Sequence, residues 1–197
     1  MTTTAKAAPQ GYSTTQIALH RAVAVLIAAQ YIFKDAISSA WDAIRAGETF
    51  AFDPLIFAHI GGGALIFAFV VWRLVLRLRR GVPAAPENEP ARLKTLSHVA
   101  HWTFYAVLAA MAVSGSVAWF GDVTQAARAH NVLKVVLLAL IALHVLAVPF
   151  HHLVLKNKVM QRMIRAQDGR RRPDRQIPTK DKDTRHAQPR PRRRSAP

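Results

Sequence analysis

Histidine is the residue type in this sequence that is best suited to chemistry, because cysteine is absent. The chain has 197 residues, with 9 histidines and no cysteine. Ionisable side chains in apolar segments are costly and tend to mark function, and neutral imidazole is a common metal ligand. The histidines therefore predict a metal or a metal-containing cofactor, whereas disulfides and iron–sulfur clusters held by Cys are excluded. Eight of them lie in or at the edges of long apolar segments: His20, His59, His98, His101, His130, His144, His151 and His152.

The apolar segments that contain these histidines are long enough to cross a membrane. A helix needs about 20 apolar residues to span a ~30 Å hydrocarbon core, and lipid forces every backbone polar group to be paired internally. We therefore expect an all-α fold, a four-transmembrane-helix bundle within residues 15–155. A polar segment precedes it at residues 1–14, and a basic tail follows at residues 156–197. The four segments are residues 15–37, 54–78, 95–120 and 130–155.

A cleaved signal peptide is the alternative for the first apolar segment, with residues 38–40 as the cleavage region. The segment is long for that purpose, and it contains His20, Arg21 and Lys34. A secretory signal avoids such residues in its apolar stretch. The sequence therefore favours a permanent membrane span.

Charge between the segments predicts the orientation of the bundle in a bacterial inner membrane. The link between the second and third segments is basic, and residues 156–197 carry fifteen Lys and Arg against four Asp. Basic segments stay in the cytoplasm, so we expect both termini there. The tail composition is typical of a disordered segment that attracts membrane lipid. No nucleic acid partner is expected, because no aromatic residue of the tail is available for base stacking.

Depth along the helices sorts the histidines into two levels. His59 and His130 lie near the expected outer face, whereas His20 and His144 lie further in. Fourteen residues separate His130 from His144, which is ~21 Å along a helix. Fourteen steps of about 100° fall only ~40° short of four turns, so both imidazoles point from one side of the helix. One helix therefore presents two imidazoles at two depths.

This arrangement suits two stacked b-type haems, because a low-spin haem iron takes one axial ligand from each side. We assign His59 with His130 to an outer haem, and His20 with His144 to an inner haem. Zinc is the rival interpretation, but its ligands gather around one point. A pair of His98 and His101, joined by His151 and His152, remains an alternative zinc site at the inner face.

Two further residue types could contact a haem. Gly63 ends a run of three glycines just after His59, where missing side chains would let a flat macrocycle approach the helix. Helix–helix packing through small residues is the alternative interpretation. Arg73, together with Arg21 and Lys134, could pair with haem propionates or extend to the membrane interface. We select Gly63 and Arg73 as cofactor-binding candidates.

The chain resembles the bacterial cytochrome b561 family of small dihaem membrane proteins, from about residue 12 to residue 163. The fourteen-residue gap between the two histidines of the last span is its most specific element. Two departures concern the reaction at each face: Arg21 stands where the family often has Trp, and Asn131 stands where it often has an acidic residue. The resemblance rests on Leu19-His20, Ala58-His59 with Gly63, Leu96-Ser97-His98 with His101, His130, Leu143-His144 and His151-His152.

The resemblance implies that His20, His59, His130 and His144 are haem ligands and that the chain relays electrons across the membrane. It further implies oxidation of superoxide outside and reduction of ubiquinone, with a redox partner protein as the other possible donor. Arg128 and Lys134 flank His130 and would form a positive funnel for superoxide, or else act as interface anchors. His151 and Lys156 are the quinone candidates, although Lys156 also fits a simple interface anchor.

Two other functions remain open on the sequence. One is a cytochrome b membrane anchor subunit that relays electrons between quinone and a peripheral dehydrogenase or hydrogenase. The other is a helical scaffold with interior histidines and no redox role. A haem absorbance spectrum separates the scaffold from both electron-transfer functions.

Overall fold

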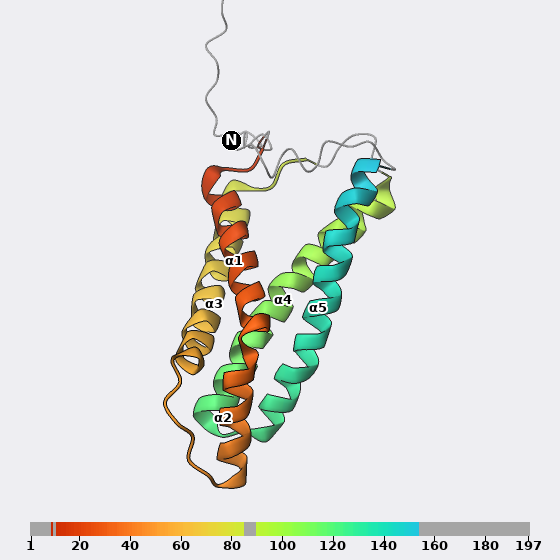
Figure 1. Ribbon diagram of the computed structural model, residues 1–197. Coiled ribbons are helices and arrows are strands. Elements are labelled where there is room, and N and C mark those ends of the chain that lie inside the picture. Colours follow the sequence, from red (N-terminus) through yellow and green to blue (C-terminus); the bar gives the residue numbers. More distant parts are fainter. Residues whose placement is uncertain (1–8, 10, 85–89, 154–197) are drawn as a thin grey trace, which may run out of the picture.

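The computed structural model describes residue 9, residues 11–84 and residues 90–153 (Figure 1). These residues form helices and no strands, which confirms the all-α class. Four of the helices are long and apolar enough to cross a membrane, as the sequence predicts. The basic tail and Lys156 lie outside the described residues. The helices are α1 (Thr14–Ile32), α2 (Lys34–Ala46), α3 (Pro54–Arg80), α4 (Ala91–Gly121) and α5 (Thr124–Leu153).

Local sequence signals set the ends of these helices. Ser13 caps α1 through a capping box with Gln16, which satisfies backbone N–H groups that the first turn leaves free. The Asp53 side chain caps α3 by accepting a hydrogen bond from the backbone N–H of Leu55, and Pro54 fits the first helical turn. Gly47 ends α2 with a φ of 75°, a left-handed conformation that glycine adopts without strain.

The first apolar segment differs from the single helix expected over residues 15–37. Helix α1 ends at Ile32, Phe33 breaks the regular backbone, and α2 continues to Ala46. Helix α1 is apolar on most sides, whereas α2 alternates apolar residues with charged ones such as Asp42 and Arg45. Both of these charged residues lie between the first two expected spans, residues 15–37 and 54–78. The polar composition of α2 explains why it leaves the apolar span and extends it as an amphipathic helix.

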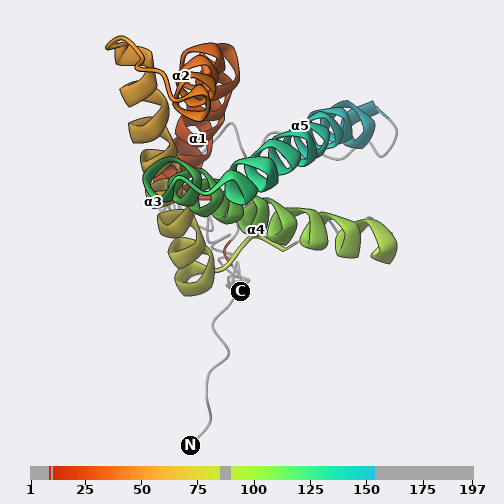
Figure 2. The ribbon, with the colours of Figure 1, turned by 90° about the horizontal axis from the view of Figure 1, so that it is seen from below.

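The four long helices run up and down, with each antiparallel to the next (Figure 1). Helix α4 packs on α5 and on α3, and α1 packs on α3, an arrangement also visible from below (Figure 2). We call the end that holds α2 and the α4–α5 turn the α2 end. The opposite end, where α1 begins and α5 finishes, is called the tail end. This up-and-down topology follows from short connections between neighbouring helices.

Buried apolar side chains from all four long helices meet in the middle of the bundle. Most remaining apolar side chains are exposed, including Phe57, Val113 and Leu146, as expected where a helix faces lipid tails instead of water. Leu137 lies midway along α5 between His130 and His144. The apolar cluster therefore separates the two histidine levels. Its buried members are Val23, Ile66, Val70, Val107, Leu108 and Leu137.

Candidate functional site

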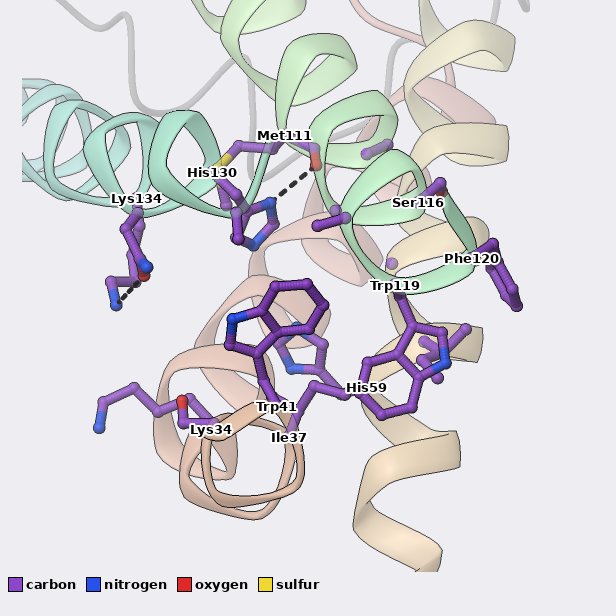
Figure 3. A pocket seen from close by; sticks show the side chains of 18 of the residues that line it. Lys34, Ile37, Trp41, His59, Met111, Ser116, Trp119, Phe120, His130 and Lys134 are labelled. Carbon is purple, nitrogen blue, oxygen red and sulfur yellow. Dashed lines mark hydrogen bonds between the residues drawn. The ribbon is translucent and has the colours of Figure 1, made fainter. Parts of the chain in front are cut away.

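His59 of α3 and His130 of α5 line one cavity at the α2 end (Figure 3). The cavity has a volume of about 350 Å³ and is bounded by α2, α3, α4 and α5. This size lies within the usual range for small-molecule and cofactor sites. The structure thus brings together the two histidines that the depth argument assigns to the outer level. Helix α2, which the sequence did not predict, supplies part of the wall through Trp41.

The imidazole of His130 is oriented by α4. Its Nδ1 donates a hydrogen bond to the carbonyl oxygen of Met111, over 3.0 Å (Figure 3). A neutral imidazole has one N–H, so this bond leaves the Nε2 lone pair free for a metal. Hydrogen bonding of the second ring nitrogen is the usual support of a histidine ligand. The arrangement at His130 therefore fits an axial haem ligand.

Gly115 of α4 is required for this position of the His130 ring. A Cβ atom at residue 115 would lie 3.0 Å from Cε1 and 3.1 Å from Nδ1 of His130. That distance is shorter than ordinary van der Waals contact, so α4 could not otherwise approach the ring so closely. Sequence reasoning missed Gly115. Its only sequence signal is a glycine within an apolar helix, which does not identify the facing residue.

The imidazole of His59 is half-buried, and one of its ring nitrogens is buried without a partner. Its Nδ1 atom has no hydrogen-bond partner among the described residues. An unsatisfied buried polar atom costs free energy, and such atoms in native proteins call for an explanation such as a bound group. The backbone at this position is fixed from α1, since the Gln30 side-chain amide donates to the His59 carbonyl oxygen over 2.9 Å. This combination fits a ring that completes its environment only with a cofactor.

The three glycines after His59 serve different purposes. A Cβ at Gly62 would collide with the side chain of Gln30, so this glycine permits close packing of α1 on α3. A Cβ at Gly63 meets nothing within 4 Å, and Gly63 lines the cavity. Gly61 is also open but does not belong to the cavity lining. Gly62 therefore fits the packing interpretation, and Gly63 fits the cofactor interpretation.

His20 of α1 and His144 of α5 meet at the level nearer the tail end. Their ring centroids are 6.3 Å apart and the ring planes make an angle of 71°. A bond from imidazole nitrogen to a metal is about 2 Å long, so a metal atom between the two rings matches this separation. The Phe104 ring packs against His144 at 5.4 Å. The structure thus brings the second expected pair together.

Arg73 of α3 reaches the same level. Its Nη1 atom lies 2.7 Å from Nδ1 of His20. A guanidinium group only donates hydrogen bonds, so Nδ1 of His20 is the acceptor. Arg73 was expected beside a haem propionate, and its position next to His20 keeps it within the candidate site. His101 of α4 also reaches this level, with its ring centroid 6.1 Å from that of His144. The sequence placed His101 only in the alternative zinc site, not beside a haem ligand.

The remaining predicted residues are distributed differently. His98 accepts a hydrogen bond from Nε1 of Trp102, over 3.0 Å, on an exposed side of α4. His151 and His152 belong to the last turn of α5, but their side chains lie outside the described part. Within residues 11–84 and 90–153, no group of three or more His, Cys, Asp or Glu side chains is placed to hold a metal ion. The described residues thus give no support to the zinc alternative.

Two lysines line the cavity at the α2 end. Lys134 was expected near the outer site, whereas Lys34 of α2 was not. Lys134 donates to the neutral Asn131 side chain over 3.0 Å, and Lys34 pairs with Asp35 at 2.5 Å. Arg128, the other expected cation, is not among the residues that line this cavity.

Known proteins agree with this architecture. The family model described as "Prokaryotic cytochrome b561" matches residues 11–166. A protein of Cereibacter sphaeroides named "Cytochrome b562" is 28% identical over 155 residues, which cover 79% of this chain and 96% of the relative. A protein of Yersinia pestis named "Probable superoxide oxidase CybB" is 25% identical over 182 residues, which cover 80% of this chain and 98% of the relative.

The family match spans all five described helices, including both histidine levels. A cytochrome b implies haem b, and the imidazoles of the bundle fit that group because they form two pairs, one with ring centroids 6.3 Å apart and one that lines a single cavity. The chain therefore belongs to the prokaryotic cytochrome b561 family, multi-pass membrane proteins that transfer electrons.

Proposed function

We propose that this chain oxidises superoxide at the α2 end and reduces ubiquinone near the tail end. Two superoxide anions would give up one electron each and become dioxygen, and one quinone would take up both electrons and two protons. His59 with His130 and His20 with His144 would each hold one haem b. When bound, these haems supply reversible one-electron transfer. Similarity to the protein named "Probable superoxide oxidase CybB" supports this activity over the anchor-subunit alternative.

The cavity at the α2 end is the observation that carries the proposal. It is lined by His59 and His130 together with Lys34 and Lys134. A positive charge at the mouth of a cleft attracts anions and raises their association rate. Lys134 contributes more to this field than Lys34, because its partner Asn131 is neutral whereas Asp35 offsets the charge of Lys34. We therefore assign the anion funnel to Lys134 and Lys34, in place of Arg128.

The proposed orientation places the α2 end outside the bacterial inner membrane and both termini in the cytoplasm. Three arginines lie in the last turn of α3, at the tail end: Arg77, Arg79 and Arg80. Arg92 and Lys94 open α4 at the same end. This asymmetry supports a cytoplasmic tail end, since basic residues remain on that side. His151 and Lys156 stay quinone candidates, because the end of α5 is also at the tail end.

Stopped-flow mixing of superoxide with the oxidised, purified protein tests the proposal. We expect the haem absorbance to show reduction faster than superoxide dismutates, and superoxide dismutase to abolish this phase. Lys134→Gln should slow the second-order rate on the order of tenfold at low salt, and added salt should shrink the difference. Arg128→Gln removes the same charge outside the cavity lining and is the matched control. A rate of haem reduction that does not change with the superoxide concentration would refute the oxidase activity.

A further inference from the structure

The tail-end level holds three imidazoles, although a haem iron has only two axial positions. His20, His101 and His144 come from α1, α4 and α5. We propose that His101 is an alternative ligand for the iron of the haem at this level. It would take the place of His20 as the partner of His144 when His20 is held away by Arg73 or is removed by substitution. This inference rests on the proposed haem at His144 and names a ligand beyond the proposed pair.

Distance does not distinguish the two candidate partners of His144. The His101 ring lies 6.1 Å from the His144 ring at an angle of 85°. The His20 ring lies 6.3 Å away at 71°. Both separations leave room for a metal atom with bonds of about 2 Å to each ring. Helix α4 also packs against His144 through Phe104, so His101 is held near His144 without any rearrangement of the helix.

Hydrogen bonding favours His101 as a ligand. Its Nδ1 donates to the carbonyl oxygen of Ser97, one helical turn earlier, over 2.5 Å. The Nε2 lone pair of neutral His101 is therefore free, as it is in His130. This is the support that a histidine ligand usually has.

At His20 the ring nitrogen Nδ1 accepts a hydrogen bond, whereas at His101 it donates one. Nδ1 of His20 accepts from the Arg73 guanidinium over 2.7 Å, so the single proton of a neutral ring is on Nε2. His20 can bind a metal through Nε2 only after Arg73 releases Nδ1 and the proton moves to it. Arg73 is thus the residue that sets which imidazole, His20 or His101, faces His144.

The α2 end provides the matched comparison. The histidines that line its cavity are His59 and His130, so removal of one leaves no described imidazole to replace it. Purified His20→Ala and His59→Ala proteins should therefore differ in haem content. We expect His20→Ala to keep about as much haem per chain as the native protein, with two low-spin ferric signals by electron paramagnetic resonance. His59→Ala should lose half of the haem or turn one signal high-spin.

The double variant His20→Ala/His101→Ala identifies the substitute ligand. It should lose the low-spin signal of the tail-end haem, which His20→Ala retains, and keep the signal of the other haem. Its haem content should therefore be half that of His20→Ala. Equal loss in His20→Ala and in the double variant would overturn the proposal. His20→Asn keeps a polar partner for Arg73 and carries the same expectation if His20→Ala does not fold.

The failure of this inference can be separated from a failure of the proposed function. Haem content of the native protein and of His144→Ala tests the haem assignment alone. If the native protein holds two haems and His144→Ala holds one, the assignment stands, and His20→Ala then decides the role of His101. If His144→Ala keeps both haems, the assignment itself is wrong.

Discussion

The two histidine levels of this bundle differ in how their imidazoles are held. At the α2 end, His130 is bonded to the Met111 carbonyl, and its ring lines a cavity of about 350 Å³. At the tail end, His20 and His144 face each other at 6.3 Å, and Arg73 occupies a nitrogen of His20. The α2 end is thus a preformed site, whereas the tail end must release a hydrogen bond before both rings can act as ligands. Preorganisation lowers the free-energy cost of binding, so the α2 end should take up haem more readily.

Filling the preformed cavity should produce the largest change. Gly63→Leu places a branched side chain in the space that a haem would occupy, because Gly63 lines the cavity and has nothing within 4 Å of its Cβ position. We expect it to abolish haem binding at the α2 end and leave the tail end intact, which halves the haem content. Gly61→Leu is the control on the same helix, since Gly61 is equally open but outside the cavity lining. Equal haem content in the two variants would contradict this role of Gly63.

A smaller effect is expected at Gly115. Gly115→Ala puts a Cβ 3.0 Å from the His130 ring, so the ring must shift and strain its bond to Met111. Overpacking of this kind destabilises a protein by about 1–3 kcal/mol. Thermal unfolding should shift downward, and one of the two low-spin signals should change while the other does not. Gly121→Ala on the same helix meets only an ordinary contact at 3.5 Å, and a similar shift there would remove the argument for Gly115.

The depth of the histidines could be predicted from the sequence because helical rise and rotation are regular. The fourteen residues from His130 to His144 were enough to predict two levels on one side of α5. The pairing of each with His59 and His20 then followed from the depth of those residues in their own spans. The structure brings both pairs together as predicted, while haem ligation by them stays a proposal.

Contacts between neighbouring helices could not be predicted in this way. Periodicity gives the face of one helix but not the residue that faces it, so the approach of Gly115 to His130 and of His101 to His144 was missed. The break at Phe33 was missed because apolar residues continue beyond it. That break places α2, and with it Lys34 and Trp41, beside the cavity.

The most direct test of the two-level haem assignment is the haem content of the purified chain, measured as pyridine haemochrome per polypeptide. We predict two haem b groups in the native protein and one in His130→Ala, which removes the best-oriented ligand of the α2 end. A native protein with one haem or none, or a His130→Ala variant that retains both, would contradict the assignment.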